Sequence, residues 1–133
     1  MALKDTKFQS LFDNLSTVWA TGWKTAFVQD FRHCILTVTW QNTSVGTLEV
    51  LASTEEDLPD FTAAASETNI YDTVQVVDLE DGTDIPWDTW LAFTADDQRN
   101  FEVNINAFNW IAVRIKARTT GDFTAKMQIT NNV

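Results

Sequence analysis

The stretch Phe101-Glu102-Val103-Asn104-Ile105-Asn106 alternates apolar and polar residues at every position. Successive side chains of a β-strand point to opposite faces, so this period of two predicts a strand with one dry and one wet face. Residues 111–117 and 123–129 repeat the pattern toward the C-terminus, and residues 34–40 and 48–52 repeat it upstream. Half-buried strands of this kind favour an antiparallel sheet, because parallel sheets are buried on both faces.

Clusters of turn-forming residues separate these segments, at 42–46, 81–84, 96–98 and 119–122. An all-β chain with short strands and frequent turns is typical of a two-sheet sandwich. We therefore predict a single antiparallel β-sandwich, with an eight-stranded jelly roll as first choice, and residues 54–69 as a loop that crosses between the sheets. The expected strands lie near residues 24–31, 33–41, 46–53, 70–79, 87–94, 99–106, 109–118 and 122–131.

The N-terminal segment follows a different period. Phe8, Leu11, Phe12 and Leu15 have the spacing of one helix face, which predicts a short amphipathic helix or arm. Thr21 and Gly22 end the pattern. The predicted division is an arm over residues 1–23 and a sandwich over residues 24–133. Such an arm either docks on a neighbouring subunit or folds back over the open end of its own sandwich.

Length and composition indicate one acidic domain. The chain has 133 residues, 44% of them hydrophobic, and carries 19 acidic against 9 basic residues, for a formal charge of −10. This charge repels nucleic acids and anionic membranes, so we expect neither as a partner. The start of the sequence lacks the apolar core of a signal peptide, and no run approaches the roughly 18 apolar residues of a membrane helix, so we expect no membrane insertion.

The charges are segregated along the chain. No lysine or arginine occurs between His33 and Gln98, a stretch that holds most of the carboxylates, whereas Arg114, Lys116 and Arg118 cluster near the C-terminus. One interpretation is a solvated acidic surface that keeps the protein soluble. The other is a polar molecule whose acidic flank meets the basic flank of a neighbour in a ring or lattice.

Catalytic chemistry is not indicated by the residue types present. His33 and Cys34 are the single histidine and the single cysteine, and as neighbours on a strand they point to opposite faces. They cannot form a nucleophile–base pair, and two residues are too few for a zinc site. We expect Cys34 in the core, and no enzyme activity, metal or cofactor. The acidic turn Asp78–Asp84 misses the spacing of an EF-hand, and we interpret it as a solvated turn rather than a calcium site.

Six tryptophans are an unusual number for a chain of this length. Trp40 is in phase with the apolar residues of its strand and is expected in the core. Exposed tryptophans can stack on sugar rings or anchor contacts between subunits. An alternative function is therefore a carbohydrate-binding β-sandwich module, with Trp87, Trp90 and Trp110 as its glycan platform.

Two parts of the chain resemble a module that is frequent in bacteriophage virion proteins. In residues 36–54 a strand ends in a short polar turn and is followed by Gly46-Thr47-Leu48-Glu49-Val50-Leu51-Ala52-Ser53. In residues 109–129 the strand Trp110-Ile111-Ala112-Val113-Arg114-Ile115 precedes a Thr/Gly turn and a last strand. The resemblance implies a small β-sandwich virion protein of the penton, decoration or head-fibre-base type.

This resemblance implies a location in the virion after assembly in the host cytoplasm, where a lone cysteine stays reduced. The expected function is that of a structural subunit that forms a homo-oligomer, a pentamer or a trimer, and docks on a major capsid protein. The hypothesis assigns docking to aromatic and aliphatic residues of the arm and assigns contacts with acidic neighbours to the basic cluster. These residues are Phe8, Leu11, Phe12, Trp19 and Trp23, and Arg114, Lys116 and Arg118.

Overall fold

A computed structural model of the chain describes residues 6–15, 23–85, 91–93 and 97–131. Over these ranges the protein is all-β, with nine strands in one sheet and no helix. All named strand pairs are antiparallel, which confirms the predicted class. The strands are β1 (Thr6–Leu15), β2 (Trp23–Phe27), β3 (His33–Ser53), β4 (Asp72–Thr73), β5 (Val76–Asp78), β6 (Thr83–Ile85), β7 (Leu91–Phe93), β8 (Asp97–Val103) and β9 (Trp110–Thr130).

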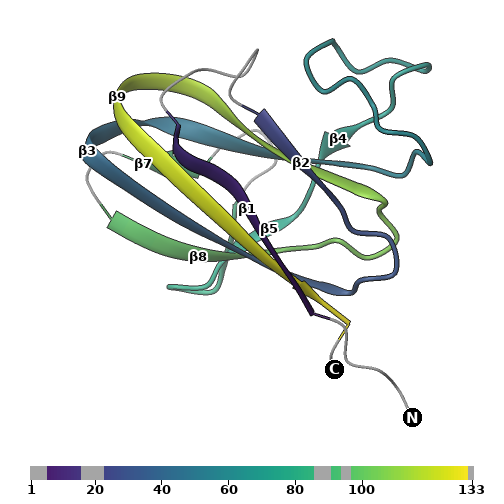
Figure 1. Cartoon of the computed structure of the whole chain (residues 1–133), viewed down its shortest axis with the longest axis horizontal. Coiled ribbons are helices and arrows are strands. Elements are labelled where there is room, and N and C mark those ends of the chain that lie inside the picture. The colour runs from purple at the N-terminus through teal and green to yellow at the C-terminus, as the bar shows by residue number, and fades with distance from the viewer. Residues whose placement is uncertain (1–5, 16–22, 86–90, 94–96, 132–133) are drawn as a thin grey trace.

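The two longest strands organise the fold. β3 and β9 have 21 residues each and pair antiparallel from His33 opposite Thr130 to Ser53 opposite Trp110. Each was predicted as two strands, because turn-forming residues interrupt the alternation. These interruptions lie opposite each other, where the register shifts between Gln41 and Gly46, so they produce irregularities within continuous strands rather than chain reversals. Figure 1 shows β3 and β9 side by side across the molecule.

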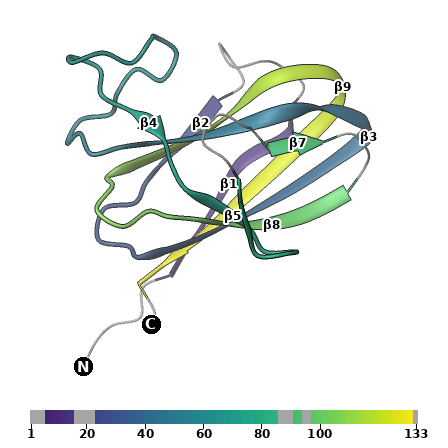
Figure 2. The ribbon, with the colours of Figure 1, turned by 180° about the vertical axis from the view of Figure 1, so that it is seen from behind.

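The other strands add to the two ends of this long pair. Around the first part of β3 the sheet has the order β1-β9-β3-β8-β5-β6, which we call the six-stranded path. Around the second part of β3, β2 pairs with β9, while β4 and β7 pair with β3. Figure 2 shows the same arrangement from behind, with the segment between β3 and β4 projecting at one corner. All described strands belong to one sheet, and their order does not show a jelly roll.

One core lies between the two ends of the bent sheet. The alternation predicted from the sequence places every second residue of β3 and β9 inside, and Cys34 and Trp40 are buried among them as expected. Residues from both parts of each long strand belong to the same cluster, so the sheet encloses its own core. The buried side chains on β3 and β9 include Leu36, Val38, Leu48, Val50, Ile111, Val113, Ile115, Phe123, Ala125, Met127 and Ile129.

The helix predicted near the N-terminus is wrong. Thr6–Leu15 is a strand that pairs with β9, from Thr6 opposite Thr130 to Leu15 opposite Phe123. Phe8 and Leu11 are three positions apart, so on a strand they point to opposite faces: Phe8 is 76% exposed and Leu11 is 4% exposed. Helical spacing was overruled because β9 offers a row of backbone groups that a strand can pair, and burial of Leu11 adds to that pairing.

Candidate interaction surfaces

The outer face of the six-stranded path is an open surface. The pairing registers align one residue of each strand in a single row across this face. Three members of the row are apolar, although the row faces away from the core. In order from β1 to β6 the row is Phe8, Gln128, Ile35, Glu102, Val77 and Asp84.

A shallow groove of about 460 Å³ lies beside Phe8 on this face. Ile35 and Lys126 also line it, from β3 and β9. On the same edge, the Gln9 side-chain amide donates a hydrogen bond to the Thr25 carbonyl at 2.9 Å, which ties β1 to β2. The groove therefore combines an exposed aromatic ring, an aliphatic side chain and one positive charge on a strand that is held at its other face.

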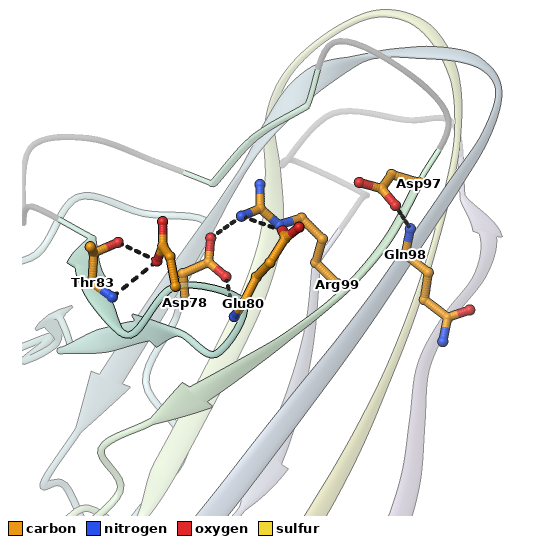
Figure 3. A network of polar contacts seen from close by, with 7 residues as sticks. Asp78, Glu80, Thr83, Asp97, Gln98 and Arg99 are labelled. Carbon is orange, nitrogen blue, oxygen red and sulfur yellow. Dashed lines mark hydrogen bonds and ion pairs between the residues drawn. The ribbon is translucent and has the colours of Figure 1, made fainter.

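A polar network occupies the hairpin formed by β5 and β6 (Figure 3). The Arg99 guanidinium forms ion pairs with Asp78 and with Glu80, the latter at 2.9 Å. Asp78 is buried, and its other carboxylate oxygen accepts a hydrogen bond from the Glu80 N–H at 3.0 Å. Burial of the Asp78 charge is offset by Arg99, so the network fixes the hairpin against β8.

The tip of this hairpin is a tight acidic turn. Gly82 has φ +75 and its N–H donates to the Asp78 carbonyl at 2.7 Å. Hydrogen bonds from the Thr83 hydroxyl and N–H lower the pKa of Asp81 below its ordinary value, so this carboxylate is charged at neutral pH. Arg99 supplies the positive charge next to Asp78 and Glu80. Among the described residues, no group of three or more His, Cys, Asp or Glu side chains has the arrangement of a metal site.

A second ion pair lies on the opposite part of the sheet, beneath residues 54–71. Arg114 Nε donates to Glu49 Oε2 at 2.9 Å, and both side chains are buried. Arg114 Nη1 donates to the Phe61 carbonyl at 2.6 Å. The Phe61 ring is fully buried against Leu51 and Ala112 in a small second cluster. One arginine therefore joins two strands to the long loop, and we call residues 54–71 the clamped loop.

Further hydrogen bonds hold the clamped loop at both ends. Ser53 Oγ donates to the Ile70 carbonyl at 2.5 Å, and the Asn109 amide donates to the Thr54 and Glu55 carbonyls. Within the loop, the hydroxyl and N–H of Thr62 bond to Asp60 and lower its pKa. The notebook of contacts is therefore that of an ordered surface feature, and the expectation that these residues cross between sheets as a loop fits their lack of long strands.

The predicted docking residues have different environments. Phe8 is exposed on β1, as a docking residue requires. Leu11 is in the core and Arg114 is in the internal pair with Glu49, so the structure removes both from the accessible set, because each side chain is satisfied within its own chain. Lys116 is half-buried on β9. Phe12, Trp23 and Arg118 lie in β1, β2 and β9, where only their backbone is described, and Trp19 lies outside the described residues.

Of the predicted glycan platform, Trp87 and Trp90 lie outside the described residues. Trp110 is half-buried at the start of β9. Its ring makes an edge-to-face contact with Phe27 at a centroid distance of 4.8 Å, and its indole N–H donates to the Glu56 carbonyl at 3.3 Å. Part of the Trp110 side chain is therefore engaged by its own chain and helps to hold the clamped loop.

Both ion-pair networks were missed in the sequence. The available signal was a single charge within an otherwise apolar strand: Glu49 among Leu48 and Val50, and Arg114 between Val113 and Ile115. Alternation shows that such a residue points away from the core. It does not show that another layer of chain covers that face.

Two further observations concern chemistry and membranes. Burial raises the pKa of the Cys34 thiol to about 12, so it is protonated at neutral pH, whereas the neighbouring His33 is exposed. Within the described ranges, no helix has the length and hydropathy needed to cross a membrane.

Comparison with known proteins identifies the fold. No family model matches the sequence, and no curated protein matches it. Two solved structures share the bent antiparallel sheet. One is the SPBc2 prophage-derived protein YomS, with a TM-score of 0.70, 12% identity, and coverage of 98% of this chain and 96% of that chain. The other is the PBSX exported protein XepA, with a TM-score of 0.71 and 13% identity; this chain is covered to 98% but spans 39% of that protein.

Proposed function

We propose that this chain is a phage-encoded structural subunit that acts by self-association and by docking on a major capsid protein, as a penton or decoration subunit of the virion. The observation that carries this proposal is the exposed Phe8 on a ten-residue edge strand, beside a groove that also holds Ile35 and Lys126. An aromatic anchor flanked by an apolar floor and a charge is the composition of an interaction hot spot.

The fold likeness supports the phage part of the proposal. Two proteins whose printed descriptions are prophage-derived and PBSX exported have the same fold over nearly all of this chain. The sequence resemblance to virion modules points in the same direction and involves β3 and β9, the strands that organise the sheet.

The chemistry of the described residues supports a function without catalysis. Arg99 and Arg114 neutralise buried carboxylates and hold chain segments in place. The Cys34 thiol is buried, and its raised pKa keeps it from acting as a thiolate nucleophile. These groups contribute to stability, which leaves the exposed surfaces for binding.

Particle composition tests the proposal. The phage or prophage that encodes the chain is induced, its particles are purified by density gradient, and their proteins are quantified by mass spectrometry. We expect the chain in a fixed ratio to the major capsid protein, and we expect Phe8→Asp to reduce that ratio at least tenfold. Absence of the chain from purified particles, with the chain present in the lysate, would contradict a virion role.

A further inference from the structure

The six-stranded path ends in two open edges. Among the described residues, β1 pairs only with β9, and β6 pairs only with β5. Each edge displays a large apolar side chain on the outer face. Phe8 is 76% exposed on β1, and Leu79, two residues after outward-facing Val77, is 45% exposed beside β6. Exposed apolar groups at both ends of one sheet face indicate surfaces that another molecule covers.

The two edges carry opposite charges. Lys7 and Lys126 are exposed at the β1 edge. The β5–β6 hairpin exposes Glu80, Asp81 and Asp84, and the Arg99 charge is engaged by Asp78 and Glu80. Four strands lie between the edges, which at a spacing of about 4.8 Å per strand separates them by roughly 24 Å. One chain therefore cannot bring its own two edges together.

Strand direction permits the edges of two copies to join. The path has five pairings, and each is antiparallel, so β1 and β6 run in opposite directions. When β6 of one copy lies beside β1 of the next, the new pair is antiparallel and the alternation of the sheet continues. The outer row then places Asp84 next to the following copy's Phe8, and Leu79 lies one diagonal step away.

We propose that the β1 edge and its groove accept the β5–β6 hairpin of a second copy, head to tail. This inference rests on the proposed function for its self-association and goes beyond it by assigning both surfaces. Leu79 contacts Phe8, while Lys7 and Lys126 face the hairpin carboxylates. A contact between two different surfaces repeats from copy to copy and gives a closed ring or an open chain. A symmetric contact between two β1 edges would instead bring Lys7 and Lys126 close to their own counterparts.

The test measures the mass of the full chain by light scattering after size exclusion, over a range of concentrations. The variants are Phe8→Asp and Leu79→Asp, and the matched control is Ile70→Asp, whose side chain is 44% exposed on the clamped loop. We expect the wild type and the control to assemble above the 15.1 kDa monomer and each edge variant to be a monomer. An equimolar mixture of the two edge variants should give a dimer and nothing larger, because each pair retains one intact contact.

Other outcomes overturn the proposal. A monomeric wild type at all concentrations contradicts it, and so does assembly of Leu79→Asp when Phe8→Asp is monomeric, which is the signature of a symmetric β1 contact. Urea unfolding midpoints equal to that of the wild type show that the edge variants are folded. The proposed function is judged separately by particle composition: a monomeric chain found in virions overturns only this contact, whereas head-to-tail assembly of a chain absent from virions overturns only the virion role.

Discussion

Glu49 and Arg114 lie directly opposite each other on β3 and β9, and their side chains form a buried ion pair at 2.9 Å beneath the clamped loop. The pair stands on the face that alternation assigns to solvent. Phe61 brings a second layer of chain over that face, and its carbonyl accepts a further hydrogen bond from Arg114. The charge of Arg114 therefore serves the internal structure, and its role can be tested by removing either or both partners.

Removal of one partner should be strongly destabilising. In Arg114→Ala the Glu49 carboxylate stays buried without its counter-charge, and we expect a loss of about 3–5 kcal/mol in the free energy of unfolding. The double variant Glu49→Leu with Arg114→Met replaces both charges by apolar groups and should recover most of this loss. Urea unfolding followed by tryptophan fluorescence measures both. Equal stability of the single and double variants would show that the buried charge is not the cause.

The Arg99 network should depend on Asp78 more than on Glu80. Asp78 is buried and Glu80 is largely exposed, and exposed ion pairs contribute little. We expect Arg99→Ala to reduce the free energy of unfolding by about 1–3 kcal/mol, because a buried carboxylate loses its donor. Glu80→Ala should change it by less than about 0.5 kcal/mol. A larger effect of Glu80→Ala than of Arg99→Ala in urea unfolding would contradict this order.

The sequence predicted the sheet better than it predicted the layer above it. Alternation placed Leu36, Val38 and Trp40 in the core, because a period of two assigns every residue of a strand to one face. It missed β1, since the spacing of Phe8 and Leu11 also fits a helix and only pairing with β9 decides between them. It could not show the Glu49–Arg114 pair, which depends on where residues 54–71 return to the sheet.

Cys34 should make the stability of the fold depend on alkaline pH. Burial raises the pKa of its thiol from 9.0 to about 12. The folded state therefore retains a proton that the unfolded state loses, so this contribution is complete below pH 9 and is lost as the pH rises toward 12. Between pH 9 and 10.5 the free energy of unfolding should fall more steeply in the wild type than in Cys34→Ala, by up to about 1.4 kcal/mol per pH unit. Equal slopes in urea titrations would show that the thiol ionises freely in the fold.

The clamped loop should open independently of the main core. Phe61 packs with Leu51 and Ala112 in a cluster separate from the core between the two parts of the sheet. Replacing a buried phenylalanine by alanine removes about 3–5 kcal/mol of packing, and in Phe61→Ala this loss falls first on the loop. We therefore expect amide hydrogen exchange to accelerate at least a hundredfold over residues 59–71, where Asn69 and Ser66 exchange backbone hydrogen bonds, and much less in the centre of β9.

A matched variant separates this local effect from general damage. Leu58 lies in the same loop but is 46% exposed, so Leu58→Ala removes apolar surface without opening a cavity. Exchange in Leu58→Ala should stay within about threefold of the wild type, because exposed substitutions change stability by about 0.5 kcal/mol or less. If Phe61→Ala instead accelerates exchange equally in the loop and in the centre of β9, the loop and the core unfold as one cooperative unit, and the separation of the two clusters has no energetic meaning.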